Sequence, residues 1–342
     1  MLPLMLARFI STGEALTDFI RTEDHWIAKA GGAGWNVARV VARLGLPAIL
    51  DNSAPSGLSA VLDNSAPSGV LAKTAPTGPR RLSAASAVGL SSDPFGDELF
   101  RLSVEAGLET DYIQRFDKSP PLAMVTQSHP PHYFFIRDDS ADLAFDPAHL
   151  PKGWLEAAEL VHFSCLSLLK DPLKSRLLEL ATQVRAAGKR ISYDPNYRQS
   201  FTADYDSTLE RMTKLANFIK VSDEDLCGLF RTDHPKQGLE QLRIWNPRAP
   251  IMLTKGADGA DLLLPHETLS APGVRVEVVD TVGAGDACMG GLAFHWLTFP
   301  GSSWQDRLEF AVAAGAAACT RAGAYAPSLE EIEGLLRSSA LS

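Results

Sequence analysis

Short β-rich runs alternate with helical stretches over most of the 342 residues. Because neighbouring runs of this kind join through helical crossovers, the alternation predicts an α/β fold with a mostly parallel sheet and helices on both faces. Three of the predicted helices are followed by a glycine that can cap their C-terminus. We interpret residues 1–342 as a single domain. The predicted strands are 8–13, 86–90, 159–164, 190–194, 218–222 and 250–256, and the predicted helices include 35–44, 95–106, 171–187 and 204–216.

Residues 121–139 depart from this rhythm, with two β-like runs around the turn His129-Pro130-Pro131-His132. Together with residues 15–22 they predict a small antiparallel sheet. We expect this sheet to act as a lid, formed by about 15–30 and 120–140. The two histidines are not expected to bind a metal, because no cysteine or third histidine is near. The acidic residues at its end are expected to be a solvated rim: Asp138, Asp139 and Asp142.

Residues 50–82 form the second departure, because "LDNSAPSG" occurs at 50–57 and again at 62–69. Proline, glycine, serine and alanine dominate this segment, so it can bury little apolar surface. We interpret it as a flexible insertion tolerated in a loop, with a partner-binding arm as the alternative. It follows a helix and precedes a strand, which predicts a position at the edge opposite the usual ligand crevice.

Composition limits the classes of partner. The chain is 45% hydrophobic and 21% charged with a net charge of -9, so no basic surface for nucleic acid or anionic membranes is expected. Its four cysteines contain no CxxC pair, which argues against a zinc ribbon or a disulfide framework. No apolar run approaches the roughly 18 residues of a membrane span. These features predict a cytoplasmic protein.

The stretch "DTVGAGDACMGG", residues 280–291, carries the strongest chemical signal. A strand-like "VEVVD" (276–280) precedes it, and a run of helical length follows it. Gly283, Ala284 and Gly285 would form the turn into that helix, whose first N–H groups have no internal acceptor and attract anions. Asp286 then places a carboxylate beside an anion site. That combination suits phosphoryl transfer, in which the carboxylate accepts the proton of an attacking hydroxyl.

The same stretch resembles the C-terminal signature of the ribokinase-like (PfkB-type) carbohydrate kinases. "GGAGWNVARVVARLG" (31–45) resembles their N-terminal signature, and "GEALTDF" (13–19) resembles the first strand of fructokinases and 2-keto-3-deoxygluconate kinases. Further motifs follow in the family's order: "SSDPFGDEL" (91–99), "DPNYR" (194–198), "KVSDEDL" (220–226), "TKGADG" (254–259) and "RAGAYAPS" (321–328). The resemblance runs nearly end to end apart from 50–82. It implies a ribokinase-like three-layer α/β/α fold with a small β-sheet lid, and ATP-dependent phosphorylation of a sugar hydroxyl.

The resemblance also implies residue roles. Asp286 would be the general base, with Gly283, Ala284 and Gly285 as the anion hole. ATP would be bound by Asn196, Arg198, Lys220, Ser222, Thr254, Lys255, Gly256 and Gly259, where Lys255 is either a phosphate contact or a solvated charge. The sugar would be bound by Asp18, Gly32, Asn36 and, from the lid, Arg137.

Two positions depart from the family pattern. The usual NxxE appears as Ser222-Asp223-Glu224-Asp225, so Asp225 would reach Mg²⁺ through water and most ligands of that ion would be ATP oxygens and waters. Gly34-Trp35 replaces the more usual Pro-Ala, and Trp35 is expected in the core. The family often binds K⁺ through backbone carbonyls beside residues 280–286, and its lids can pair into a homodimer.

Several alternatives stay open at this level. The substrate could be fructose or 2-keto-3-deoxygluconate, or the protein could be a nucleoside kinase of the same fold. A catalytically silent sugar- or nucleotide-binding regulator is a further alternative. A dinucleotide-dependent oxidoreductase is disfavoured, because residues 31–34 lack the GxGxxG spacing. No P-loop or protein-kinase motif is present.

Overall fold

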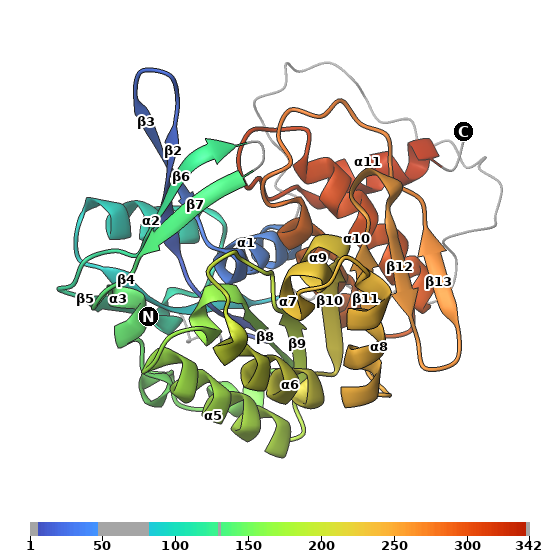
Figure 1. Cartoon of the computed structure of the whole chain (residues 1–342), viewed down its shortest axis with the longest axis horizontal. Coiled ribbons are helices and arrows are strands. Elements are labelled where there is room, and N and C mark those ends of the chain that lie inside the picture. The colour runs from blue at the N-terminus through green and yellow to red at the C-terminus, as the bar shows by residue number, and fades with distance from the viewer. Residues whose placement is uncertain (1–5, 47–81, 129–130, 340–342) are drawn as a thin grey trace, which may run out of the picture.

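The structure is a computed structural model and describes residues 6–46, 82–128 and 131–339. Its body is a nine-stranded sheet in the order β13-β12-β11-β10-β9-β8-β1-β4-β5 (Figure 1). The neighbours from β11 to β5 are parallel, and only β12 and β13 run antiparallel at one edge. The predicted α/β fold is therefore confirmed. The strands are β1 (Phe9–Thr12), β4 (Ala84–Ser91), β5 (Ile113–Phe116), β8 (Leu160–Ser164), β9 (Arg190–Asp194), β10 (Phe218–Ser222), β11 (Ile251–Thr254), β12 (Ala260–Leu263) and β13 (Thr268–Ala271).

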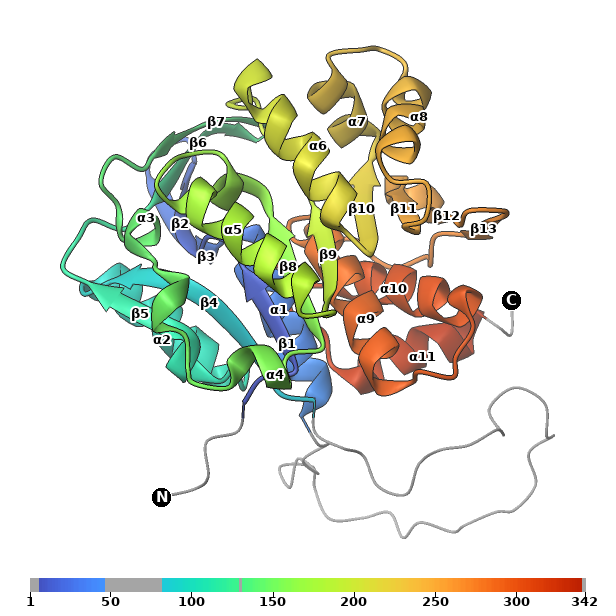
Figure 2. The same ribbon diagram turned by 90° about the horizontal axis from the view of Figure 1, so that it is seen from below.

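Helices cover both faces of this sheet (Figure 2). One face carries α1 (Ala33–Gly45), α9 (Ala284–Thr298) and α10 (Trp304–Ala318), and the other carries α5 (Leu173–Ala186), α6 (Asp206–Leu215) and α8 (Pro235–Trp245). Successive strand residues point to opposite faces, so Phe9 and Ile10 belong to two separate buried clusters. The remaining helices are α2 (Pro94–Glu105), α3 (Ala141–Ala144), α4 (Trp154–Ala157), α7 (Asp223–Phe230) and α11 (Leu329–Ser339).

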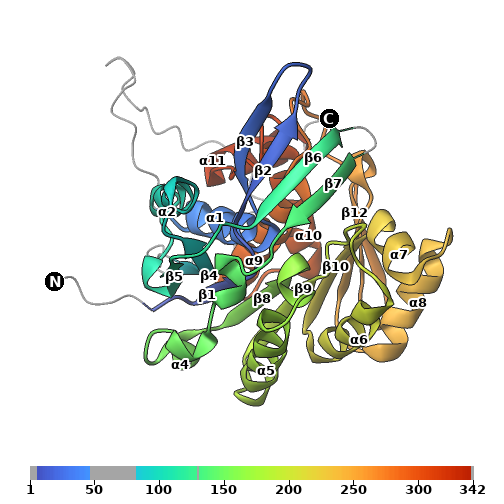
Figure 3. The ribbon, with the colours of Figure 1, turned by 60° about the vertical axis from the view of Figure 1, so that its left-hand side comes forward.

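A second, four-stranded sheet stands off the body in the order β3-β2-β6-β7 (Figure 3). Its strands are β2 (Leu16–Arg21), β3 (Trp26–Gly31), β6 (Leu122–Ser128) and β7 (Pro131–Ile136). We call it the small sheet. The expectation of a purely antiparallel sheet was wrong, because β2 pairs with β6 in parallel while β2–β3 and β6–β7 are antiparallel. Strands β2 and β6 are far apart in the chain. Because no short hairpin connects them, they are not forced to run antiparallel.

The six predicted strands of the body are confirmed as β1, β4, β8, β9, β10 and β11, with boundaries that differ by a few residues. The strand expected at 276–280 is absent, and Val278 and Val279 are more than half exposed. The hairpin of β12 and β13 extends the sheet beyond β11, and the Val279 N–H donates instead to the Cys319 carbonyl at 2.8 Å. It runs as an extended connection to α9.

Most of the 50–82 insertion, and His129 of the predicted turn, lie outside the described residues. None of the helices within the described ranges is long and apolar enough to cross a membrane.

Helix α9 packs closely on both α1 and α10 because two of its residues lack side chains. A Cβ placed on Gly290 would stand 2.7 Å from Cβ and Cγ1 of Val40 in α1, and one placed on Gly291 would stand 2.6 Å from Cβ of Ala314 in α10. Gly290 therefore lets the backbone of α1 approach α9, and Gly291 lets α10 approach it. The approach of α1 and α9 matters for the site, because one functional side chain comes from each of them.

Replacing Gly290 by alanine should therefore destabilise the fold. The branched Val40 side chain cannot move away by a terminal rotation, so overpacking should cost about 1–3 kcal/mol and outweigh the gain in helix propensity. The matched control is Gly334→Ala in α11, where a Cβ would meet nothing within 4 Å and stability should be unchanged or higher. Urea unfolding of both variants measures the difference. Equal stabilities would show that α1 and α9 do not pack this closely.

Candidate active site

The N-termini of α1 and α9 meet above the carboxyl ends of the parallel strands. There the Asn36 Nδ2 donates a 2.8 Å hydrogen bond to Oδ2 of Asp286, and both side chains are buried. Gly32 and Gly283, the residues before the two helices, have positive φ angles of 118° and 78°. A Cβ on Gly32 would stand 2.2 Å from the carbonyl oxygen of Glu14, so only glycine fits that turn.

The ionisation of Asp286 is strongly perturbed. Burial raises the pKa of its carboxyl group from 3.8 to about 7, and the Asn36 hydrogen bond, Lys220 and Arg198 lower it only in part. A carboxylate with a pKa near 7 is a stronger base than an ordinary aspartate and still ionises at neutral pH. Asp286 is therefore suited to accept and release a proton.

The turn into α9 leaves backbone donors free. Among the described residues no acceptor is present for the N–H groups of Gly285 and Asp286, whereas the Ala284 N–H donates to the carbonyl of Thr281 at 3.2 Å. Free N–H groups at a helix N-terminus attract negative charge, and the helix dipole adds to this effect. Of the residues predicted to form the anion hole, Gly285 has a free N–H group and Ala284 does not, and Asp286 adds a second free N–H group.

A buried ion pair lies beneath this turn. The Lys220 Nζ is 3.0 Å from Oδ2 of Asp194, and it would stand 3.1 Å from a Cβ placed on Gly285. Burial by itself lowers the pKa of Lys220, but the carboxylates of Asp194 and Asp225 outweigh it and raise that pKa above its usual value. The ammonium therefore stays charged under the turn, where it favours an anion.

The Ser222-to-Asp225 segment forms a capping box at the start of α7. The Asp225 Oδ2 accepts from the Ser222 N–H at 2.8 Å, and its Oδ1 accepts from the Tyr197 N–H at 2.7 Å. The carboxylate thus joins α7 to the turn after β9. A serine followed three residues later by an acid is a capping-box signature, so the sequence contained the signal for this role. Within the described ranges no group of three or more acidic, histidine or cysteine side chains could hold a metal.

The turn after β9 positions Asn196 and Arg198. Asn196 adopts a left-handed backbone, φ 43°, and its N–H donates to Oδ1 of Asp194 at 3.0 Å. The Arg198 Nη1 donates to the carbonyls of Asn196 and Tyr197 at 3.0 and 2.8 Å, which folds the side chain back over the turn. From there its charge lowers the pKa values of three site carboxyl groups, Glu14, Asp18 and Asp286. Arg198 is therefore the cation that these carboxylates share.

The "TKGADG" turn after β11 places its predicted ATP ligands in three different settings. Gly256 has a φ of 57° and open space around it, so a ligand can approach its backbone. Gly259 has a φ of 92°, and its Cβ would stand 2.1 Å from the carbonyl of Ala271, so it is required by packing. The Lys255 Nζ forms a 2.8 Å ion pair with Asp261, and Thr254 Oγ1 donates to the Val221 carbonyl at 3.4 Å.

On the small sheet, Asp18 lies directly across from Lys29 in the β2–β3 pair. Burial raises the pKa of Asp18 to about 6, and Arg198 and Lys29 lower it in part. At the other side of the site, Oδ1 of Asn36 is buried with no hydrogen-bond donor among the described residues. A buried amide oxygen without a donor is costly, so it provides a ready acceptor for a hydroxyl placed next to Asp286.

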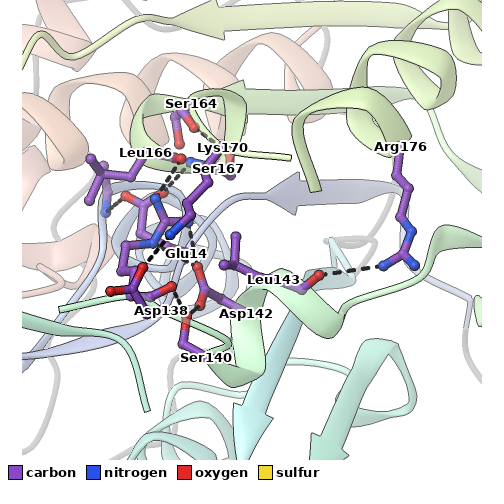
Figure 4. Close-up of polar contacts among 12 residues, drawn as sticks. Glu14, Asp138, Ser140, Asp142, Leu143, Ser164, Leu166, Ser167, Lys170 and Arg176 are labelled. Atoms are coloured by element: carbon purple, nitrogen blue, oxygen red, sulfur yellow. Dashed lines mark hydrogen bonds and ion pairs between the residues drawn. The ribbon is translucent and has the colours of Figure 1, made fainter. Parts of the chain in front are cut away.

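Arg137 directly follows β7, and its guanidinium group is bound by protein acceptors. Its Nε and Nη2 donate to Oδ2 of Asp142 at 3.0 and 2.5 Å, and its Nη1 donates to the Leu166 carbonyl at 2.8 Å. The expectation that Asp142 belongs to a solvated rim was wrong, because Asp142 is buried by this pair and by Ser140 (Figure 4). Asp138 and Asp139 are exposed as expected, and they pair with Lys170 and Lys118.

Glu14 is a site residue that the sequence reasoning missed. It is almost fully buried, and its two oxygens accept from the N–H groups of Ala33 at 3.3 Å and Ser167 at 3.2 Å (Figure 4). Burial raises the pKa of Glu14 to about 7, with Arg137 and Arg198 opposing. It therefore ties the start of α1 to the 3-10 turn Cys165–Leu168. An acid directly after a buried strand, within "GEALTDF", was the available signal.

Comparison with known proteins identifies the family. The family model described as "pfkB family carbohydrate kinase" matches residues 72–332, which is more than half of the chain. Fructokinase-2 of Zea mays is 30% identical, over 94% of this chain and 91% of that protein. The chain belongs to the PfkB family of carbohydrate kinases. Probable fructokinase-6, chloroplastic, of Arabidopsis thaliana is also 30% identical, over 62% of this chain and 58% of that protein.

Solved structures agree with this assignment. A fructokinase with bound ATP from Xylella fastidiosa is 28% identical, with a TM-score of 0.78 over 98% of this chain and 100% of that one. The protein is thus a phosphotransferase with an alcohol acceptor on a ribokinase-like fold, as the motifs predicted. A dinucleotide-dependent oxidoreductase does not fit this kinase family.

The buried Asp286 should make stability depend on pH. Its folded pKa of about 7 lies above the unfolded value of 3.8, so its contribution is fully present below about pH 4 and is lost as the pH rises to 7. Asp286→Asn removes the charge and keeps an acceptor for Asn36. We expect the variant to gain roughly 1–4 kcal/mol over the parent protein at pH 8, with little difference near pH 4.

Chemical denaturation of both proteins from pH 4 to pH 8 measures this effect. Asp138→Asn, at an exposed carboxylate, is the control and should show no such trend. A constant difference between Asp286→Asn and the parent protein across the range would contradict a raised pKa at Asp286.

Proposed function

We propose that this kinase transfers the γ-phosphoryl group of ATP to a hydroxyl of a neutral ketose, with fructose as the substrate. The observation that carries the proposal is the setting of Asp286. Its Oδ2 is held by Asn36, its pKa is about 7, and free N–H groups adjoin it at the start of α9. A base and an anion site at one helix terminus are the two elements that the reaction requires.

The reaction follows from these groups. The sugar hydroxyl donates its proton to Asp286 as its oxygen attacks the γ-phosphorus, and the bond from that phosphorus to the bridging oxygen of ATP breaks to release ADP. The N–H groups of Gly285 and Asp286 stabilise the negative charge on the transferred group. Lys220, charged beneath the turn, adds to this stabilisation. The protonated Asp286 then loses its proton to solvent, which a pKa near 7 permits.

The charges around the site favour a neutral sugar over a sugar acid. Arg137 is neutralised by Asp142, so it has no free charge for a substrate carboxylate. Glu14, Asp18 and Asp286 already surround Arg198. A further carboxylate would be repelled there, whereas sugar hydroxyls can donate to Asp18 and to the free Asn36 Oδ1 and can approach the Gly32 backbone. The matched fructokinases support the same choice, and 2-keto-3-deoxygluconate is the second candidate.

ATP would extend from the anion hole to the turn after β11, where the open backbone of Gly256 suits a phosphate oxygen. Asn196, Ser222, Thr254, Lys255 and Gly259 line the proposed path. The ATP named for the Xylella fastidiosa fructokinase supports this role. Bound Mg²⁺ would neutralise charge on the phosphates. Both Asp225 oxygens already accept backbone N–H groups, so we propose that the ion is held chiefly by ATP oxygens and waters.

Three further roles belong to this proposal. The small sheet would close over the sugar as a lid and exclude water. The small sheet also exposes Phe134 and Ile136, which suit contact with a second copy of the chain, so a lid-to-lid homodimer is proposed.

A K⁺ ion would bind carbonyls between residues 280–284 and the neighbouring loop, where the Gly323 N–H donates to Asp280 Oδ2 at 2.7 Å.

Asp286→Asn should lower kcat with fructose about 10²–10⁴-fold and leave KM nearly unchanged, because the base acts in the transition state. In the parent enzyme kcat/KM should fall as the pH drops below about 7, where Asp286 becomes protonated. ADP release with Mg-ATP measures both effects, and Asp138→Asn is the control. Undiminished turnover by the Asp286 variant would refute its assignment as the base.

Asp142→Asn should shift the substrate preference toward sugar acids. Removing the charge that neutralises Arg137 leaves a guanidinium that can pair with a carboxylate. We expect kcat/KM for 2-keto-3-deoxygluconate relative to fructose to rise about tenfold. Asp138→Asn, at an exposed neighbour paired with Lys170, should leave the ratio unchanged. An unchanged ratio in the Asp142 variant would contradict our account of the specificity.

A further inference from the structure

A cavity with a volume of about 340 Å³ lies between the small sheet, α1 and α2. It is lined by Thr17 and Ala30 of the small sheet, Phe95 and Leu99 of α2, Arg39 of α1, and Gly323. Thr17 and Asp18 are neighbours on β2 and therefore point to opposite faces. The cavity thus opens on the face of the small sheet away from Asp18. None of the residues assigned above to sugar, ATP or phosphoryl transfer lines it.

Arg39 provides a positive charge on this cavity. Its guanidinium stacks on the Trp35 ring, 4.4 Å from the centroid, and its Nη1 donates to the Ala324 carbonyl at 3.3 Å. It makes no ion pair with any described residue, and its Nε is buried without an acceptor. Burial lowers the pKa of Arg39, and the charge of the Glu105 carboxylate opposes this. A partly buried guanidinium without a counter-ion favours an anion beside it.

Thr17 adds a second group that lacks a partner. Thr17 is only 4% exposed and lines the cavity, and no described residue hydrogen-bonds to its hydroxyl. This hydroxyl can donate to an anionic oxygen or accept from a ligand hydroxyl.

The other charges near the cavity do not cancel Arg39. The Glu98 carboxylate, at the cavity rim, is paired with Arg101 at 2.7 Å. Lys29 also lines the cavity, and its Nζ is 3.9 Å from Oδ2 of Asp280. The apolar remainder of the wall, with Phe95 and Leu99, suits a short carbon skeleton. The volume lies at the lower end of the range for small-molecule sites.

We propose that this cavity binds a small organic anion, whose carboxylate or phosphate pairs with Arg39 and whose oxygens hydrogen-bond to Thr17. Arg39 supplies a planar donor fork that suits either anionic group. The site is separate from that of phosphoryl transfer, so it provides the carbohydrate kinase with a second ligand.

Calorimetric titration of the full chain tests this proposal, with glycerol 3-phosphate and succinate as separate probes. The protein is first saturated with Mg²⁺ and a non-hydrolysable ATP analogue, so that the anion hole at Gly285 is filled. Saturable binding of glycerol 3-phosphate would assign a phosphate ligand, and binding of succinate would assign a carboxylate. A separate titration with the ATP analogue alone tests the proposed ATP site. Failure of the analogue to bind would count against that site and not against the cavity.

Three variants locate the binding. Arg39→Met keeps a stem over Trp35 but removes the charge, and it should raise the Kd about tenfold or more. Thr17→Val removes the hydroxyl with little change of shape and should also weaken binding. Arg185→Met makes the same charge change at the exposed end of α5, on the face of the sheet opposite α1, and should leave the Kd within about twofold. Melting temperatures without probe confirm that each variant is folded.

The proposal is overturned if neither probe binds, or if Arg39→Met and Thr17→Val bind as tightly as the parent protein. Equal weakening by Arg185→Met would also overturn it, because binding would then follow the net charge of the chain.

Discussion

The buried carboxylate of Asp286, held by Asn36, is the constraint on which the rest of the site depends. Removing a carboxyl group from water raises its pKa unless donors and cations compensate, and here they do so only in part. The helix termini that carry the two residues must meet within hydrogen-bonding distance. Glycine at positions 32 and 283 allows the entering turns, and glycine at position 290 allows the helices themselves to approach.

The buried cations around Asp286 are nearly all engaged by groups of the protein itself. Two of the buried cations are committed to carboxylates, Arg137 to Asp142 and Lys220 to Asp194. Arg198 is held by backbone carbonyls instead and is shared among several acidic groups. The substrate region is therefore rich in hydrogen-bond acceptors and poor in free positive charge. Such a surface suits hydroxyl groups, and this is the basis of our proposal that the substrate is a neutral sugar.

The replacement of the family's NxxE by Ser222 and Asp225 also has a physical explanation. A glutamate at the last position would reach further into the site, whereas the shorter Asp225 turns back and caps α7 with Ser222. Its second oxygen holds the Tyr197 N–H, and so fixes the turn that presents Arg198. In this protein the position therefore organises backbone around the site, and under our proposal the charges of ATP would be balanced mainly by other groups.

The sequence by itself determined the alternation of strands and helices, the glycine turn before Asp286 and the order of the family motifs. These are local patterns, set by backbone propensity and by neighbouring residues. The tertiary structure alone decided the parallel pairing of β2 with β6, the burial of Asp142, and the role of Glu14 between α1 and the Cys165–Leu168 turn. It also decided that residues 276–280 leave the sheet despite their β-branched side chains. The strand pairing, the Glu14 contacts and the path of residues 276–280 depend on partners distant in the chain. The Asp142–Arg137 pair joins residues that are near in sequence, but both side chains are buried only in the folded protein.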